Sequence, residues 1–265
     1  MMLYGFTNVP VEWELRAGKA HADISVTVEV DAIVQGPDGR VWTVPAFWAG
    51  DDRFRVRFAG PAPGHYTLRS VCSAADDSGL HGRQTEAEIV PYIGTSPLYQ
   101  HGRLCVTQNG RTFEHADGTP FLWLADTWWM GLTTRLDWPH GFRHLATDRA
   151  RKGFNTIQIV AGPLPDFDAT IATWDRQQAN EAGWPWTERA GRDTAAPPTP
   201  QDFHRLNPAF YDLADLRVAC LVEMGLMPCI VGMWGYYFHF IGLANAKRHW
   251  RNLVARYGAY PVTWC

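Results

Sequence analysis

The sequence predicts a chain of two domains, an N-terminal antiparallel β-sandwich of Ig-like type followed by the first half of a (β/α)₈ barrel, the TIM-barrel fold. Short alternating segments, separated by glycine- and proline-rich turns, fill the first ninety or so residues. This pattern is typical of sandwiches. From residue 121 onward, four short apolar segments alternate with helical patterns. Such alternation indicates βα units around a parallel sheet.

In the sandwich domain, residues 1–92, five segments are expected to form strands: Ile24–Val34, Val41–Val44, Arg53–Phe58, His65–Cys72 and Gln84–Val90. The turn Gly36–Gly39 reads GPDG, in which proline presets φ and glycine tolerates a positive φ. Residues 93–120 are expected to form a linker and a small hairpin. Its strands, Leu104–Gln108 and Thr112–His115, turn at Asn109–Gly110.

The barrel domain, residues 121–265, is expected to contain four strands, at Phe121–Ala125, Thr156–Val160, Met227–Val231 and Pro261–Trp264. Helices are expected at Gly141–Lys152, from Pro208 to about Met224, and at Gly242–Tyr257. Asn207 suits the N-cap of the second helix, and Pro208 suits its first position. The stretch Ala161–Leu206 shows no clear periodicity, and loops of this length are usually functional.

Composition argues against several classes of function. The net charge of −3 over 265 residues gives no reason to expect a polyanionic partner. No basic run interleaves with aromatic residues, so nucleic-acid binding is not expected. Five cysteines without a CxxC motif support neither a zinc site nor a disulfide framework. We expect no cofactor and no metal.

The location of the protein is predicted from segments that the sequence lacks. No apolar run is long enough to span a membrane, and the N-terminus lacks the pattern of a signal peptide. The sequence therefore predicts a cytoplasmic protein without a membrane partner. A secreted or periplasmic location stays open if a leader precedes residue 1. The oligomeric state is not predicted.

Candidate functional residues gather at the ends of the expected barrel strands, where barrels carry their catalytic groups. The first strand is followed by Asp126, Trp128 and Trp129, and the third by Trp234 and Tyr237. Aromatic rings can stack on the apolar faces of sugars, so the four aromatic residues are candidates for substrate binding. Asp126 is a candidate catalytic carboxylate, with a structural hydrogen-bonding role as its alternative.

The second strand and the long segment after it supply the remaining candidates. Gln158 either contacts the ligand or is a core amide whose hydrogen bonds are satisfied. Asp166 and Asp168 lie nearest the strand end and rank first as catalytic carboxylates. Three residues further along are candidates for substrate binding: Asn180, Glu181 and Trp184.

Several sharper motifs are absent from the sequence, namely GxSxG, the P-loop, GxGxxG and HExxH. Their absence argues against α/β-hydrolase, nucleotide-binding and zinc-dependent hydrolase functions. Carboxylates beside aromatic side chains instead match glycoside hydrolysis. In that reaction one acid protonates the leaving oxygen, while a second carboxylate attacks the sugar or activates water.

Three stretches carry a resemblance to a known family: GRTFEHADGTPFLWLADTWW, RARKGFNTIQIV and WRNLVARYGAYPVTW. They resemble the apiosidase-like, cellulase-type glycoside hydrolases, which have a (β/α)₈ barrel. The stretch VPAFWAGDDRFRVRFAGPAPGHYTL resembles the β-sandwich domain that often precedes such barrels. The resemblance covers most of the chain and does not specify the sugar.

The resemblance implies a catalytic glutamate a few residues after the fourth strand, and a sequence that ends at Cys265 has no position for it. The resemblance also extends to specific residues, firmly to Asp126, Trp128, Gln158 and Trp234, and loosely to Asp166 or Asp168 and to Asn180–Glu181. We therefore expect a C-terminally truncated glycoside hydrolase that acts on a plant or microbial polysaccharide or oligosaccharide, with the chain itself inactive. The alternatives are a non-catalytic carbohydrate-binding or scaffold module, and a half-barrel that dimerises to complete itself.

Overall fold

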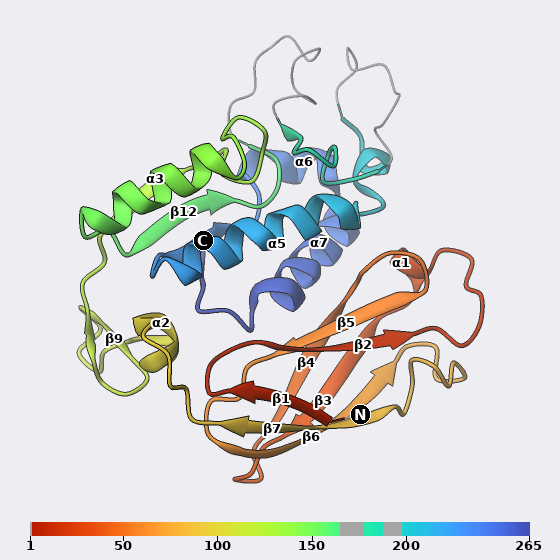
Figure 1. Cartoon of the computed structure of the whole chain (residues 1–265). Coiled ribbons are helices and arrows are strands. Elements are labelled where there is room, and N and C mark those ends of the chain that lie inside the picture. The colour runs from red at the N-terminus through yellow and green to blue at the C-terminus, as the bar shows by residue number, and fades with distance from the viewer. Residues whose placement is uncertain (1, 165–177, 188–197) are drawn as a thin grey trace. The chain divides into compact units, whose positions relative to one another are not determined.

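The computed structural model describes residues 2–164, 178–187 and 198–265 (Figure 1). The chain divides into two compact units. The first holds the residues up to Arg103 together with Arg251–Pro261, and the second holds Leu104–Trp250 together with Val262–Cys265. The division at Arg103 falls inside the segment 93–120 that is expected to be a linker.

The first unit is built around a seven-stranded sheet of order β1-β7-β6-β3-β4-β5-β2. Its strands are β1 (Met2–Phe6), β2 (Val11–Arg16), β3 (Val30–Gln35), β4 (Val41–Trp48), β5 (Arg53–Phe58), β6 (Gly64–Cys72) and β7 (Gln84–Val90). β4 joins the two halves of the sheet, because its residues up to Pro45 pair with β3 and those from Ala46 pair with β5. The core holds inward-facing residues such as Trp13, Val34 and Tyr66.

The expected strand Ile24–Val34 is wrong in its first half, where the structure has a short helix, α1 (Ile24–Thr27). Local hydrogen bonds to Asp23 favour this turn. The Ser25 hydroxyl donates to the Asp23 carboxylate, and the Thr27 hydroxyl donates to the Asp23 carbonyl. Such side-chain bonds compete with strand pairing. Alternation resumes in β3, which therefore begins at Val30.

Two strands were not expected from the sequence, β1 and β2, and one of them changes the character of the sheet. β1 pairs with β7 in parallel, with Leu3 opposite Ala87 and Gly5 opposite Ile89. The sheet is therefore not purely antiparallel. This pairing joins residues far apart along the chain, which local alternation cannot reveal. A second short helix, α2 (Pro97–Gln100), follows β7.

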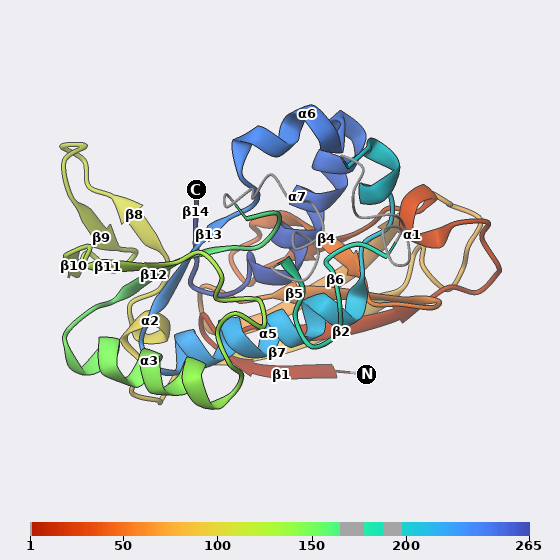
Figure 2. The same ribbon diagram turned by 90° about the horizontal axis from the view of Figure 1, so that it is seen from above.

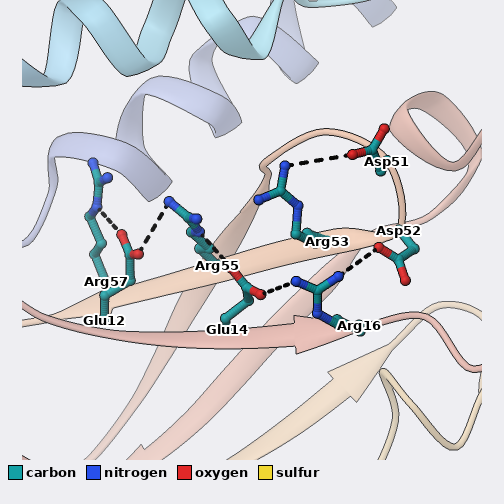
Figure 3. A network of polar contacts seen from close by, with 8 residues as sticks. All are labelled: Glu12, Glu14, Arg16, Asp51, Asp52, Arg53, Arg55 and Arg57. Atoms are coloured by element: carbon teal, nitrogen blue, oxygen red, sulfur yellow. Dashed lines mark hydrogen bonds and ion pairs between the residues drawn. The ribbon is translucent and has the colours of Figure 1, made fainter.

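The outer face of β2 and β5 carries a ladder of paired charges (Figure 3). The antiparallel register sets Glu14 opposite Arg55 and Glu12 opposite Arg57, with N–O distances of 3.1 and 2.9 Å. Arg16 adds a pair with Glu14 at 2.9 Å. The apolar residues between these charges face the core. The alternation of RFRVRF thus belongs to a strand with one buried face.

The second unit begins with a small antiparallel sheet of order β10-β9-β8. β8 (Leu104–Val106) and β9 (Phe113–His115) form the expected hairpin, and Gly110 in its turn has φ +70°. β10 is Pro120–Phe121, so the expected barrel strand Phe121–Ala125 is wrong. Phe121 pairs with Phe113 in this small sheet, and the first parallel strand begins only at Ala125.

Four parallel strands form the main sheet of the second unit, in the order β11-β12-β13-β14 (Figure 2). β12 (Thr156–Val160) and β13 (Met227–Val231) have the expected bounds. β11 is Ala125–Trp128, and β14 is the short strand Thr263–Trp264. Each strand pairs with the next along the chain, so the carboxyl ends of all four lie at one edge.

Helices connect the parallel strands as expected. They are α3 (His140–Arg151), α5 (Pro208–Glu223) and α7 (Leu243–Tyr257), together with the short α6 (Phe238–Ile241) and the 3₁₀ turns η1 (Pro200–Phe203) and η2 (Gly235–Tyr237). Asn207 stands at the N-cap of α5, but its side chain makes no cap bond. It donates instead to the carbonyls of Ala182 and Trp184. Within the described ranges, no helix combines the length and apolar character needed to cross a membrane.

Candidate functional site

The register of the parallel sheet divides the predicted site residues between its two faces. Side chains alternate along a strand, and paired residues of neighbouring strands share a face. Asp126 therefore lies on the face of Ile157, its partner in β12, and Ile157 is fully buried. Gln158 lies on the opposite face, opposite Cys229 of β13. The sheet thus separates Asp126 from Gln158.

Asp126 faces α3 and accepts three hydrogen bonds from its own chain. The donors are Nε of Arg149, the indole N–H of Trp128 at 2.9 Å and the backbone N–H of Thr127 at 2.8 Å. Partial burial opposes ionisation, but the hydrogen bonds from Arg149 and Trp128 outweigh it and lower the pKa of Asp126. A general acid needs the opposite shift. The catalytic role of Asp126 stays a prediction, and these contacts favour its structural alternative.

Trp128 is also turned toward α3. Its ring meets Phe142 edge-on at a centroid distance of 5.6 Å, and only 4% of the residue is exposed. Because the ring is buried and its N–H is bonded to Asp126, no face is open for a sugar. β11 is thus held against α3 by the bond between Asp126 and Arg149 and by the contact between Trp128 and Phe142.

Trp129 and Trp234 form an exposed aromatic pair at the carboxyl edge of the sheet. Trp129 directly follows β11 and Trp234 lies three residues after β13, yet their ring centroids are 5.4 Å apart at an angle of 60°. Backbone bonds tie both residues to the end of β12, from Val160 N to Trp129 O and from Trp234 N to Pro163 O, each 3.3 Å. Each residue is 38% exposed. The structure therefore brings together two of the predicted aromatic residues with surface accessible to a ligand.

Gln158 belongs to a polar stripe on the other face of the sheet. It is paired with Cys229, and Cys229 is paired with Thr263. The Gln158 amide nitrogen lies 3.8 Å from the thiol sulfur of Cys265. Burial raises the pKa of the Cys229 thiol, which keeps it protonated at neutral pH. The neighbours of Gln158 on this face thus include the thiols of Cys229 and Cys265, which can form weak hydrogen bonds with its amide.

Asn180 and Glu181 are held by the scaffold. Asn180 is buried, and its amide donates to the carbonyl of Phe210 at 2.8 Å. Glu181 accepts two bonds from one nitrogen of Arg217, at 2.8 and 2.9 Å. Arg217 is fully buried, and its guanidinium lies 5.1 Å from the ring centroid of Trp138. Asn180 and Glu181, which were predicted to bind substrate, thus attach their own segment to α5.

Trp184 and Tyr237 lie in a buried aromatic cluster. Trp184 packs on Trp186 at 5.2 Å and on Phe203 at 5.6 Å, and Tyr237 is fully buried in the same cluster. The amide of Gln178 reaches the Tyr237 hydroxyl at 3.5 Å. Trp184 and Tyr237, which were predicted to bind substrate, therefore lie in the buried cluster that also holds Met233, just after β13.

His249 is a residue of this region that sequence reasoning missed. It is fully buried, and desolvation lowers its pKa to about 4. Nε2 lies 2.6 Å from the Gly232 carbonyl, and Nδ1 lies 3.3 Å from the Tyr211 hydroxyl. A carbonyl only accepts, so Nε2 carries the hydrogen and Nδ1 of the neutral ring accepts from Tyr211.

Two glycines allow this arrangement. A Cβ on Gly162 would lie 2.3 Å from the Gly232 carbonyl oxygen and 3.1 Å from His249 Nε2. A Cβ on Gly232 would lie 2.3 Å from the ring of Trp250. The ends of β12 and β13 approach this closely because Gly162 lacks a side chain, and the ring of Trp250 packs against the end of β13 because Gly232 lacks one. The signal in the sequence is a glycine within two residues of each apolar strand.

Asp166 and Asp168, the two carboxylates ranked first as catalytic, lie outside the described residues. Within the described part of the chain, no three histidine, cysteine, aspartate or glutamate side chains are grouped as they would be around a metal ion. The described site is therefore an aromatic pair at the carboxyl edge of a parallel sheet, supported by a neutral buried histidine and by polar residues of the scaffold.

Comparisons with known proteins give two family matches. Residues 107–265 match the family described as "Apiosidase-like, catalytic domain", and residues 9–73 match a domain of unknown function, DUF5060. No curated protein matches the chain.

Among solved structures, the chain resembles a candidate glycoside hydrolase from Bacteroides vulgatus ATCC 8482, with a TM-score of 0.74 and 17% identity. The match covers 99% of this chain and 48% of that protein, so the chain spans about half its length. A glycoside hydrolase family 5 protein from the same organism has a TM-score of 0.46 and 20% identity, over 63% of this chain and 32% of its own. Another glycoside hydrolase has a TM-score of 0.45 and 21% identity, over 64% and 35%. Only the first likeness is strong enough to indicate a shared fold.

Proposed function

Because the chain belongs to the apiosidase-like catalytic domain family, we propose that it is part of an O-glycosyl hydrolase acting on a plant or microbial polysaccharide or oligosaccharide. Membership of this family supports a carbohydrate-active protein. In this proposal the four parallel strands are the first half of a (β/α)₈ barrel, and the seven-stranded unit is an Ig-like sandwich. The fold shared with a candidate glycoside hydrolase supports both points.

The observation that carries the proposal is the pair Trp129 and Trp234. Both are partly exposed, and they stand together at the carboxyl edge of the sheet, where barrels of this type hold their substrates. Indole rings offer flat apolar surfaces with a polar edge, which suit the apolar faces and hydroxyl rims of sugars. A glycosidic substrate would lie across this pair, and Gln158 would reach it from the inner face of the barrel.

Glycoside hydrolysis also needs two carboxylates. We propose that Asp166 or Asp168 supplies one of them, and that the second comes from a part of the gene product other than these 265 residues. Asp126 then acts as a positioning residue, because its bonds to Arg149 and Trp128 hold the end of β11 beside Trp129. On this view the 265-residue chain alone binds sugar without turnover.

The test is sugar release by the full gene product on a panel of plant and microbial polysaccharides. We expect release of oligosaccharide, and a loss of about a hundredfold or more in kcat on removing a catalytic carboxylate through Asp166→Asn or Asp168→Asn. Asp51→Asn is the matched control, because this aspartate has a side chain that is 87% exposed in the first unit. Release that persists undiminished in both variants would overturn the assignment of these carboxylates.

A non-catalytic carbohydrate-binding module is the second candidate. It is favoured by one observation, namely that Asp126, a carboxylate within β11, already forms a hydrogen bond with Arg149 of the same chain. The same panel separates the two functions. Retention on a polysaccharide in affinity electrophoresis, with no sugar released by the full gene product, would favour binding alone.

A further inference from the structure

An open groove crosses the outer face of the first unit's sheet, and none of its lining residues belongs to the strands of the site described above. It encloses about 590 Å³, and its lining residues come from β1, β3, β6 and β7: Met2, Ile33, Gln35, Thr67, Leu68, Arg69, Gln84, Thr85 and Glu86. Figure 1 shows these strands side by side. At a strand spacing of about 4.8 Å, four neighbouring strands span about 14 Å. The groove thus has room for more than one sugar ring.

The pairing of the strands places the polar lining residues on one face. Gln35 is opposite Thr67, Thr67 is opposite Glu86, and Arg69 is opposite Gln84. Pairs in register share a face of the sheet, so these side chains form a continuous polar surface. It consists of two amides, a hydroxyl, a guanidinium and a carboxylate, which together offer donors and acceptors at short intervals.

Most of these polar groups are not used by the fold. Within the described residues, the side chains of Gln35, Thr67, Arg69 and Gln84 make no hydrogen bond or ion pair. Glu86 alone has a partner, His65 at 3.5 Å. The charged ladder on β2 and β5 shows the contrast, because each of its arginines is paired with a glutamate or an aspartate (Figure 3). An unpaired polar surface of this kind is available to a ligand.

Apolar side chains lie beside the polar ones on the same face. Met2 is opposite Glu86, and Tyr4, two residues along β1, is opposite Glu88. Tyr4 is 75% exposed, and Met2 is 39% exposed. Tyr4 stands next to the groove's lining, and a phenol ring on the same face as amides and a hydroxyl suits a sugar, which has apolar C–H faces and a polar rim. The lining carries one arginine and one glutamate, and Glu88 lies opposite Tyr4, so this surface has no excess of positive charge and does not favour a polyanion.

We infer that this groove binds a segment of a neutral polysaccharide, as a second carbohydrate site distinct from the Trp129–Trp234 pair. The choice of carbohydrate rests in part on the proposed function, and the groove's own chemistry selects a neutral chain. Gln35, Gln84 and Arg69 bond to sugar hydroxyls, and Tyr4 stacks on a ring face. Binding at the groove would keep the protein attached to the polysaccharide while the Trp129–Trp234 pair binds the part of the chain to be cleaved.

Affinity electrophoresis of the 265-residue chain tests the inference, using gels that contain neutral xyloglucan, mixed-linkage glucan or galactomannan, with polygalacturonate as the acidic comparison. We expect retardation on at least one neutral polymer and none on polygalacturonate. The double variant Arg69→Ala/Gln84→Ala should bind about tenfold or more weakly, which corresponds to the loss of about 1.4 kcal/mol. Gln108→Ala/Arg111→Ala is the matched control, because both residues are exposed in the β8–β9 hairpin.

The outcomes separate this inference from the proposed function. Retardation that survives Trp129→Ala and is clearly reduced in the groove variant supports the groove. The inference is overturned if the groove variant is retarded like the wild type, if polygalacturonate retards the chain more strongly than every neutral polymer, or if no neutral polymer retards it. None of these outcomes depends on sugar release, which tests the proposed function. Circular dichroism of each variant shows whether it is folded.

Discussion

At the scale of single residues, the polar side chains predicted for the site serve mainly to hold the scaffold together. Asp126, Asn180 and Glu181 each bond to their own chain, through Arg149, the Phe210 carbonyl and Arg217 respectively. Trp129 and Trp234 differ, because each keeps 38% of its surface exposed. Among these described residues, the exposed surface thus belongs to apolar rings, which favours binding a ligand by stacking.

His249 gives a prediction about pH. The folded protein binds a proton on this ring only near pH 4, whereas the unfolded chain binds it near 6.5. The contribution of the neutral ring to stability is therefore fully present above pH 6.5 and is lost as the pH falls toward 4. The free energy of unfolding should fall by on the order of 3 kcal/mol from this group.

The measurement is urea-induced unfolding at pH 7 and pH 4.5, followed by tryptophan fluorescence, for the wild type and His249→Gln. The glutamine can still donate to the Gly232 carbonyl but cannot titrate. We expect a smaller loss of stability between the two pH values in the variant than in the wild type. Equal losses would show that His249 is not the buried neutral group described here.

At the scale of elements, the close approach of β12 and β13 at their carboxyl ends rests on glycine. The nearest atom to a Cβ on Gly162 would be the Gly232 carbonyl oxygen, at 2.3 Å, and a backbone atom cannot swing aside as a side chain can. Gly162→Ala should therefore destabilise the fold by about 1–3 kcal/mol. It should also displace the backbone that leads to Trp234.

Chemical denaturation measures the first effect. Gly235→Ala is the matched control, because a Cβ there would meet nothing within 4 Å, and this variant should be unchanged. If Gly162→Ala were as stable as Gly235→Ala, the two strand ends would lie further apart than the structure has them.

Some elements could be predicted from sequence because their signals are local. β12 and β13 have the expected bounds, since each is a short apolar run between breakers. The helices α3 and α5 lie within a residue or so of expectation, because Gly153 and Gly225, both with positive φ, end them. The stretch FLWLA was misassigned, because Phe121 pairs with Phe113 outside the parallel sheet.

The site could be predicted only in part, because its geometry depends on register. Asp126 and Gln158 both lie within strands of the parallel sheet, but a shift of one residue reverses the face on which a side chain lies. The sequence does not determine that shift. The aromatic pair was partly predictable: both tryptophans follow strands, although their contact depends on how β11 and β13 flank β12.

At the scale of the whole molecule, two separate surfaces suit carbohydrate, one in each unit. The groove on the first unit has a polar lining that spans four neighbouring strands, as a site for polymer would need. The aromatic pair of the second unit stands at the edge where a barrel performs its chemistry. Taken together, the two proposals assign polysaccharide binding to the groove and binding of the bond to be cleaved to the aromatic pair.

The central claim is that Trp129 and Trp234 contact the sugar, and oligosaccharide binding by isothermal titration calorimetry tests it most directly. The titrations use the Arg69→Ala/Gln84→Ala background, so that the groove does not contribute. Trp123→Ala is the control, because Trp123 also forms an aromatic pair at 5.4 Å, with Phe113 beside the hairpin. We predict that Trp129→Ala and Trp234→Ala each weaken binding about tenfold or more, while Trp123→Ala binds like its parent. Equal binding by all three variants would contradict the account.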